Sequence, residues 1–210
     1  MMKGPIRFIS TAIKKSEFSL KNFLSNNLPI NVSSKMGSQK ITIKDLVEKA
    51  KLENRPLVFT FTPGPFKDAK ELPKSWTAVP DAVGCTLQLN TFNKHFENLA
   101  GSVFALNKHT HDYQCGHDGL LAVKNLDNLM MLSITDDLES NLKLDTILVD
   151  DKKYLSRFTI AVKSTGEAQS FPLQGPVNDE KIKKHIEEIN CFIMPKLIDE
   201  ERAEMAELKL

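Results

Sequence analysis

Apolar and polar positions along the chain follow two different spacings. Runs dominated by apolar residues, typical of strands buried on both faces, occupy residues 57–62, 102–106 and 129–133. Apolar residues that recur every three or four positions predict helices over residues 43–52, 85–99, 136–142 and 182–193. Two further segments, 158–163 and 168–173, flank Ser164-Thr165-Gly166 and predict a hairpin. This order of strands and helices predicts an α/β fold in which helices cover both faces of a mixed central sheet.

The two ends of the chain differ from its middle. Residues 1–40 are rich in Ser, Asn and Lys, which predicts a loosely attached extension, and residues 41–194 carry the core pattern. Residues 195–210 are charged and predict a terminal helix. The first sixteen residues contain four basic and no acidic side chains, which suits both a mitochondrial targeting peptide and an ordinary basic tail. We expect a cytoplasmic protein, with a mitochondrial location as the alternative.

Composition narrows the function classes. The net charge of +1 over 210 residues predicts binding neither to nucleic acid nor to an anionic membrane. No apolar run has the length that a membrane-spanning helix needs. The three cysteines, Cys85, Cys115 and Cys191, are too few for a structural disulfide framework. Their number fits a reducing compartment, where thiols react or simply pack.

Cys85 lies between a long proline-containing segment, residues 63–84, and a predicted helix. A thiol in the first turn of a helix meets unpaired backbone N–H groups and the positive end of the helix dipole, and both favour the thiolate. Gly84 leaves room for a reactant to approach, and Thr86 offers a hydroxyl. The alternative interpretation is a small apolar residue of the core, since most free cysteines are buried.

A family resemblance adds to this local interpretation. Residues 79–88 read Val-Pro-Asp-Ala-Val-Gly-Cys-Thr-Leu-Gln and are followed by Phe92 and Phe96. This segment resembles the peroxidatic segment of peroxiredoxins, in particular the bacterioferritin-comigratory-like branch, in which Gly-Cys-Thr precedes a helix. The resemblance covers most of the chain and implies a thioredoxin-like fold. It also implies that Cys85 reduces hydrogen peroxide or organic hydroperoxides without a metal or organic cofactor.

Arg157 enters through the same resemblance. The segment Ser156-Arg157-Phe158-Thr159 resembles the late arginine segment of peroxiredoxins. The resemblance implies that the Arg157 guanidinium lies near Cys85, where it would stabilise the thiolate and hold peroxide oxygens.

The sequence departs from the family pattern at two positions. Peroxiredoxins usually have Thr or Ser three residues before the attacking cysteine and Pro seven residues before it, whereas this chain has Ala82 and Ala78. The missing hydroxyl normally helps to orient the peroxide, and Thr77 or Thr86 could supply it instead. The alternative is a non-catalytic redoxin-like module that binds a partner or senses redox state.

The resemblance also bears on the resolving cysteine. The comigratory-like branch often has it five residues after the attacking cysteine, where this chain has Asn90. The run from Tyr113 to Leu120, with Cys115-Gly116, resembles the resolving segment of bacterial thiol peroxidases. It implies a disulfide between Cys85 and Cys115 that thioredoxin or a similar dithiol reduces. Cys191 is expected to pack on its helix or to pair across a dimer, so a monomer and a homodimer both stay open.

One further cluster could bind a metal. His109, His111, Cys115 and His117 are nitrogen and sulfur donors within nine residues. Their spacing matches no standard metal site, so solvated histidines in a polar loop are the expectation and a metal site is the alternative.

Overall fold

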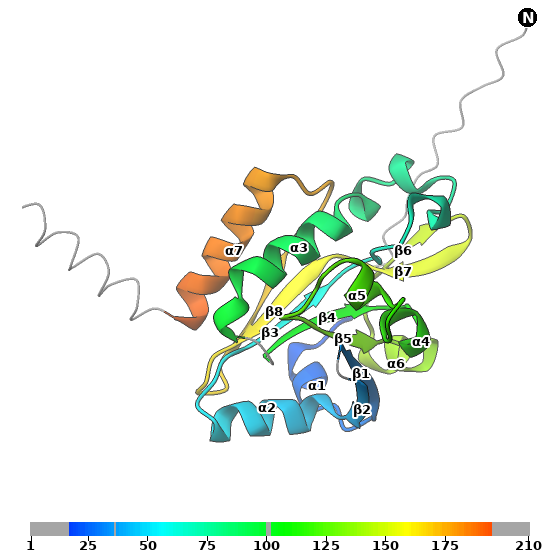
Figure 1. Cartoon of the computed structure of the whole chain (residues 1–210). Coiled ribbons are helices and arrows are strands. Elements are labelled where there is room, and N and C mark those ends of the chain that lie inside the picture. Colours follow the sequence, from blue (N-terminus) through cyan, green and yellow to red (C-terminus); the bar gives the residue numbers. More distant parts are fainter. Residues whose placement is uncertain (1–16, 36, 100–101, 195–210) are drawn as a thin grey trace, which may run out of the picture.

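The computed structural model describes residues 17–35, 37–99 and 102–194. A seven-stranded mixed sheet forms its centre, in the order β2-β1-β5-β4-β3-β8-β9 (Figure 1). The strands are β1 (Ile30–Ser34), β2 (Gly37–Ile41), β3 (Leu57–Phe61), β4 (Val103–Asn107), β5 (Met130–Ser133), β8 (Phe158–Val162) and β9 (Ala168–Pro172). Strands β3, β4 and β5 are parallel, and β8 and β1 run antiparallel to their neighbours β3 and β5. Two more strands, β6 (Thr146–Val149) and β7 (Lys152–Leu155), form a separate hairpin.

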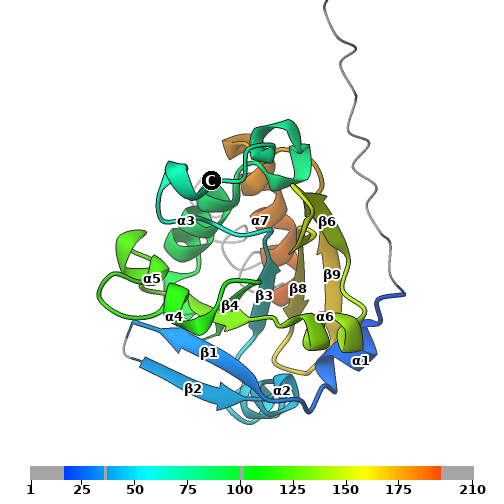
Figure 2. The same cartoon turned by 90° about the vertical axis from the view of Figure 1, so that its right-hand side faces the viewer.

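Helices lie on both faces of the sheet. They are α1 (Leu20–Leu24), α2 (Ile43–Leu52), α3 (Cys85–His95), α4 (His111–Gln114), α5 (Leu120–Val123), α6 (Asp136–Leu142) and α7 (Asp179–Ile193). The two long helices α3 and α7 lie side by side on one face, while α1 and α2 lie on the other (Figures 1 and 2). Within the described ranges, no helix combines the length and the apolarity that crossing a membrane would require.

Strands β3 and β4 bury every residue because both faces of the sheet are covered. In β3, Phe59 and Phe61 point into the core under α1 and α2, and Val58 points into the core under α3 and α7. All three side chains are fully buried. Burial of one such side chain contributes about 1.5–3 kcal/mol to stability. Because each strand packs into a core on both of its faces, its sequence is a continuous apolar run.

Side chains cap the starts of two of the predicted helices, α2 and α6. Thr42 accepts a hydrogen bond from the Asp45 N–H at the start of α2, and Thr135 accepts one from the Leu138 N–H at the start of α6. Both helices span the residues that their spacing predicts, and the hairpin β8–β9 is also present. The predicted α/β fold with helices on both faces of a mixed sheet is confirmed.

The structure differs from the expectation for residues 1–40. The part that it describes is built into the domain, because β1 pairs with β5 and Phe23 of α1 is completely buried. Ile30 and Val32 face the same core. The expected terminal helix over 195–210 and the targeting-type residues 1–16 lie outside the described residues.

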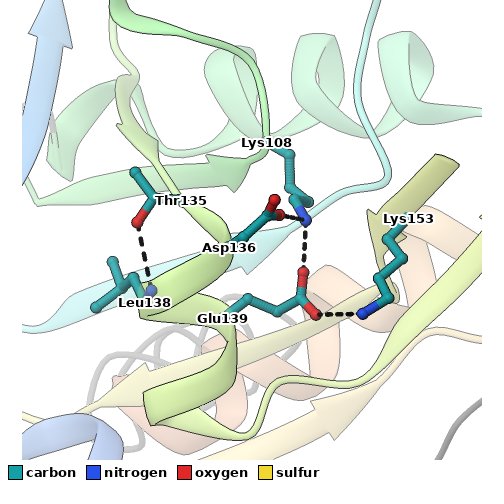
Figure 3. Close-up of polar contacts among 6 residues, drawn as sticks. All are labelled: Lys108, Thr135, Asp136, Leu138, Glu139 and Lys153. Atoms are coloured by element: carbon teal, nitrogen blue, oxygen red, sulfur yellow. Dashed lines mark hydrogen bonds and ion pairs between the residues drawn. The ribbon is translucent and has the colours of Figure 1, made fainter.

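A polar cluster holds α6 between β4 and the hairpin β6–β7. Lys108, which directly follows β4, donates to Asp136 and, at 2.5 Å, to Glu139 (Figure 3). Lys153 of β7 lies 4.0 Å from the other carboxylate oxygen of Glu139. Burial disfavours the charged form of Lys108, but its hydrogen bonds to the two carboxylates outweigh that cost and raise its pKa. The cluster links α6 to the residue after β4 and, through Lys153, to the β6–β7 hairpin.

Candidate functional site

Helix α3 begins at Cys85, against the segment that precedes α7. Gly84 is the N-cap residue and has φ +97°, a conformation that a residue with a Cβ rarely adopts. A Cβ at Gly84 would also lie 2.8 Å from both Cβ and the carbonyl oxygen of Val177. The Val177 N–H donates to the Val83 carbonyl at 3.3 Å. Glycine is thus required here both by backbone conformation and by this close approach.

Arg157 and Cys85 are in direct contact. Nη2 of Arg157 donates to Sγ of Cys85 at 3.1 Å, and Nη1 donates to the carbonyl of Gly175 at 3.1 Å. Both side chains are buried, with 4% of Cys85 and 3% of Arg157 exposed. The guanidinium is therefore held by a backbone carbonyl on one side and directs its positive charge at the sulfur on the other.

The hydrogen bonds around the sulfur differ between its two protonation states. As a thiol, Cys85 donates to the carbonyl of Ala82 at 3.2 Å. As a thiolate it has no proton to donate, but it keeps the charged donor of Arg157 and the positive end of α3. The position three residues before Cys85 thus contributes a backbone carbonyl, because the Ala82 side chain has no hydroxyl.

A small apolar cluster surrounds Cys85 and separates it from bulk water. Its other members come from the segment before α3 and from the β6–β7 hairpin: Trp76, Val79, Ala82, Ile147, Val149 and Tyr154. The sequence analysis did not predict this hairpin. Asp150 and Asp151 form its turn with φ +47° and +62°, and two such residues between apolar segments are the signal that could have identified it.

A chain of aromatic rings connects this cluster to the segment that contains Cys115. The ring of Trp76 packs edge-on against Tyr154 at 5.1 Å and against Phe66 at 5.0 Å between centroids. Phe66 contacts His109 at 5.1 Å, and His109 stacks on Tyr113 at 4.4 Å. The segment before Cys85 and the segment before Cys115 are separated by β4 in the sequence. These ring contacts pack the two segments against each other.

Tyr113 also holds the segment before α3 by hydrogen bonds. Its hydroxyl accepts the Lys67 N–H at 2.8 Å and donates to the carboxylate of Glu71. Burial and the hydrogen bond to Glu71 raise the pKa of Tyr113 well above its usual range. The phenol therefore stays protonated and keeps this contact at physiological pH.

The three cysteines are free and lie in different places. Cys115 follows α4, is half-buried, and its Sγ donates to the carbonyls of Ser34 at 3.3 Å and Gly37 at 3.5 Å. Cys191 is exposed on α7. Among the predicted site residues the structure brings Cys85 and Arg157 together, with Thr86 half-buried in the same first turn of α3, while Cys115 contacts the β1–β2 hairpin instead.

The histidines of the segment 109–117 do not converge. His111 is hydrogen-bonded to Ser33 at 2.6 Å, His109 is stacked on Tyr113, and His117 is exposed beside Asp118. Over the residues that the structure describes, no three His, Cys, Asp or Glu side chains are arranged to hold a metal ion. The geometry gives the alternative of a metal site no support.

A buried polar chain behind the site was missed by the sequence analysis. Gln88, one turn after Cys85, donates to Thr60 of β3 at 2.7 Å, and Thr60 contacts Thr159 of β8 at 3.3 Å. Thr159 in turn contacts Nε2 of His185 on α7 at 2.9 Å. Burial lowers the pKa of His185 to about 4. Threonines within otherwise apolar strands are the sequence signal for such a chain.

Comparison with known proteins identifies the fold. No protein-family model matches the chain, and no curated protein matches it in sequence. Among solved structures, a cysteine-to-serine mutant of PrxQ from Xylella fastidiosa superposes with a TM-score of 0.50 at 17% identity, covering 83% of this chain and 94% of that one. A mutant of Xanthomonas campestris peroxiredoxin Q gives a TM-score of 0.47 at 16% identity, covering 82% and 94% of the two chains.

The first match establishes the class of fold. The chain has the thioredoxin-like α/β fold of a peroxiredoxin, as the resemblance implies. In this fold the buried Cys85 begins α3, and Arg157 contacts its sulfur.

Proposed function

We propose that this protein is a peroxiredoxin-type thiol peroxidase in which the Cys85 thiolate attacks the peroxide. The observation that carries the proposal is the 3.1 Å contact from Nη2 of Arg157 to Sγ of Cys85 at the first residue of an α-helix. A thiolate at this position is stabilised by a guanidinium and by a helix dipole together. Neither feature is needed by a cysteine that only fills space.

The proposed reaction is a displacement at oxygen. The thiolate of Cys85 forms an S–O bond with the terminal oxygen of a hydroperoxide as the O–O bond breaks. The sulfur is oxidised by two electrons to a sulfenic acid, and the departing alkoxide or hydroxide takes a proton from solvent to leave as an alcohol or water. Arg157 donates hydrogen bonds to the negative charge as it moves from sulfur to the leaving oxygen. In place of the hydroxyl missing at Ala82, we propose that Thr86 helps to hold the peroxide.

We further propose that Cys115 resolves the sulfenic acid by forming a disulfide with Cys85 and releasing water, and that thioredoxin or a similar dithiol reduces this disulfide. The two Cα atoms must come within about 7 Å for the bond to form. Cys115 contacts the β1–β2 hairpin while Cys85 contacts Arg157, so both segments must rearrange. The aromatic contacts that join the two segments would part at one or more places as they rearrange.

The test is the intact mass of the reduced protein after one equivalent of hydrogen peroxide, together with the rate of peroxide consumption. Cys85→Ser should abolish both the mass change and the consumption, because no other cysteine contacts Arg157 in the described part of the chain. Cys191→Ser, at an exposed position on α7, is the matched control and should behave as the wild type. Peroxide consumption at the wild-type rate by folded Cys85→Ser would refute the proposal.

A non-catalytic redoxin module is the second candidate, and the alanine at position 82 favours it. Slow peroxide consumption by the wild type, with Cys85 intact in the mass spectrum, is the outcome that this alternative predicts. The same measurement therefore separates the two candidates.

A further inference from the structure

The orientation of the Arg157 guanidinium depends on one short backbone segment. Its Nη1 donates to the Gly175 carbonyl at 3.1 Å, and its Nη2 donates to the Cys85 sulfur at 3.1 Å. Because the guanidinium is planar and its donors have a fixed geometry, the position of the carbonyl determines where Nη2 points. The contacts that hold Gly175 in place therefore also direct the charged donor at the sulfur.

Regular secondary structure does not hold this segment. Residues 173–178 lie between the end of β9 and the start of α7 and belong to neither element. Gly175 has φ +74°, and a glycine, which has no Cβ, is free to adopt many other conformations. The next residue, Pro176, has no N–H to donate. The direction of the Gly175 carbonyl is thus set by contacts from other parts of the chain.

Asp81 supplies the contact on the N–H side of Gly175. Its carboxylate oxygen Oδ1 accepts a hydrogen bond from the Gly175 N–H. Asp81 is half-buried in the short turn Pro80–Ala82, four residues before Cys85. A hydrogen bond to an ionised carboxylate is about twice as strong as one between neutral groups. This contact therefore joins Gly175 to the segment that leads into the attacking cysteine.

Other contacts hold the neighbours of Gly175 but not Gly175 itself. The Val177 N–H donates to the Val83 carbonyl at 3.3 Å. The ammonium group of Lys181 donates to the Pro176 carbonyl at 3.5 Å. Neither bond uses the N–H or the carbonyl of Gly175. Loss of the Asp81 carboxylate would thus leave the segment attached while the Gly175 backbone loses a partner.

The contacts around the sulfur form a closed ring. The ring runs from the Cys85 sulfur through Arg157 and Gly175 to Asp81, and returns to Cys85 along the backbone. We infer that Asp81 is a positioning residue, which holds Gly175 so that Arg157 keeps its donor on the Cys85 sulfur. This inference rests on the proposed peroxidase function and adds to it a residue that acts through Arg157.

The charge of Asp81 would act in the opposite direction to its hydrogen bond. Asp81 and Arg157 line one small cavity, and a carboxylate there weakens the positive field of the guanidinium at the sulfur. Removal of the charge alone would therefore favour the thiolate, whereas loss of the hydrogen bond would disfavour it. Asp81→Asn removes the charge but keeps an oxygen that accepts from the Gly175 N–H, and Asp81→Ala removes both.

The experiment follows the rate constant for alkylation of Cys85 by iodoacetamide against pH, with the Cys85 peptide quantified by mass spectrometry. Each rate constant is divided by its plateau at high pH, so the ratio reports the thiolate fraction and cancels differences in access to the sulfur. On the rising part of the profile, Asp81→Ala should lower this ratio about twofold to tenfold, the effect of one lost hydrogen bond. Asp81→Asn should not lower it. Asp45→Ala, at an exposed position on α2 across the sheet, is the control and should keep the wild-type profile.

A double variant shows whether Asp81 acts through Arg157. In an Arg157→Ala background, Asp81→Ala should lower the ratio no further, because the guanidinium that it positions is gone. Equal effects in the two backgrounds, or a wild-type profile in folded Asp81→Ala, would overturn the inference and leave the proposed function standing. Where Asp81→Ala does not fold, Asp81→Glu displaces the carboxylate by one methylene group and should lower the ratio in the same way.

Alkylation requires no peroxide, so it is independent of the test of the proposed function. A folded wild type that consumes no peroxide would refute that function and with it any part of Asp81 in the reaction. Peroxide consumption that depends on Cys85, together with the loss in Asp81→Ala and its rescue in Asp81→Asn, would support both.

Discussion

Replacing Arg157 tests the contact on which the proposed chemistry depends. The guanidinium is buried and lies 3.1 Å from the Cys85 sulfur, so the lost interaction is a hydrogen bond to a charged group. Such bonds contribute about 1.5–3 kcal/mol, and about 1.36 kcal/mol corresponds to a factor of ten. Arg157→Ala should therefore slow alkylation of Cys85 by iodoacetamide at pH 7 roughly tenfold to one hundred-fold.

The effect on peroxide reduction should be larger. Arg157 also donates to the oxygen that carries the developing charge, and removal of one such donor costs about 10²–10³ in rate. Stopped-flow fluorescence of Trp76 measures this step, and intact mass after iodoacetamide measures the alkylation. Arg157→Lys keeps the charge but cannot reach Gly175 and Cys85 at once, so it should lose part of the rate.

The control for this series is Arg55→Ala, at a partly exposed position beside Glu53. It should leave both rates unchanged. Thermal unfolding first establishes that each variant is folded, because Arg157 is buried and its loss also costs stability. Wild-type alkylation and peroxide rates in folded Arg157→Ala would refute the assignment of Arg157 to thiolate stabilisation.

Three further predictions concern the helix start, the buried histidine and the resolving thiol. Gly84→Ala should lower the free energy of unfolding by about 1–3 kcal/mol in urea titrations, because φ at this position is +97° and the new Cβ would lie 2.8 Å from Val177. The same change should slow the alkylation of Cys85 by iodoacetamide. Unaltered stability would contradict this prediction. His185 has its pKa lowered to about 4, so its neutral form favours folding above pH 6.5 and that contribution is lost as pH falls toward 4. His185→Gln should remove about 3 kcal/mol of the stability difference between pH 7 and pH 4, as measured by urea titrations at the two pH values. In Cys115→Ser, excess peroxide should convert Cys85 to a sulfinic acid, seen as a gain of two oxygens in the intact mass. The wild type should instead form a disulfide between Cys85 and Cys115. A different cysteine pair in peptide maps of the oxidised wild type would refute that pairing.

Local signals in the sequence account for much of the fold. Helices α2 and α6 could be predicted to the residue because a capping threonine precedes each amphipathic run. The hairpin β6–β7 was not predicted because Leu148 is half exposed and Asp150-Asp151 resembles an ordinary charged turn. Strand β1 was not predicted because its short alternation of apolar residues lies among serines and asparagines. Its apolar side chains become buried only when the strand pairs with β5.

The site depends more on contacts between distant residues. Position at a helix N-terminus and Gly84 are local, so Cys85 could be selected from sequence spacing. Its partner Arg157 is 72 positions away along the chain, and spacing alone cannot place the two side chains together. The family resemblance predicted that approach, and the Gly175 carbonyl that orients the guanidinium had no sequence signal.

The aromatic contacts between the two cysteine-containing segments would add to the cost of the proposed resolution of Cys85 by Cys115. A disulfide between Cys85 and Cys115 requires that the rings of Trp76, Phe66 and His109 separate at one or more of their contacts. Each aromatic contact is worth about 0.5–1.5 kcal/mol beyond burial, so parting two of them costs about 1–3 kcal/mol. Whole domains unfold at about 5–15 kcal/mol, so this opening is accessible while the sheet stays intact. The same fold can therefore adopt a closed conformation that shields the thiolate and an open conformation that permits resolution. The aromatic contacts set the population of the open conformation.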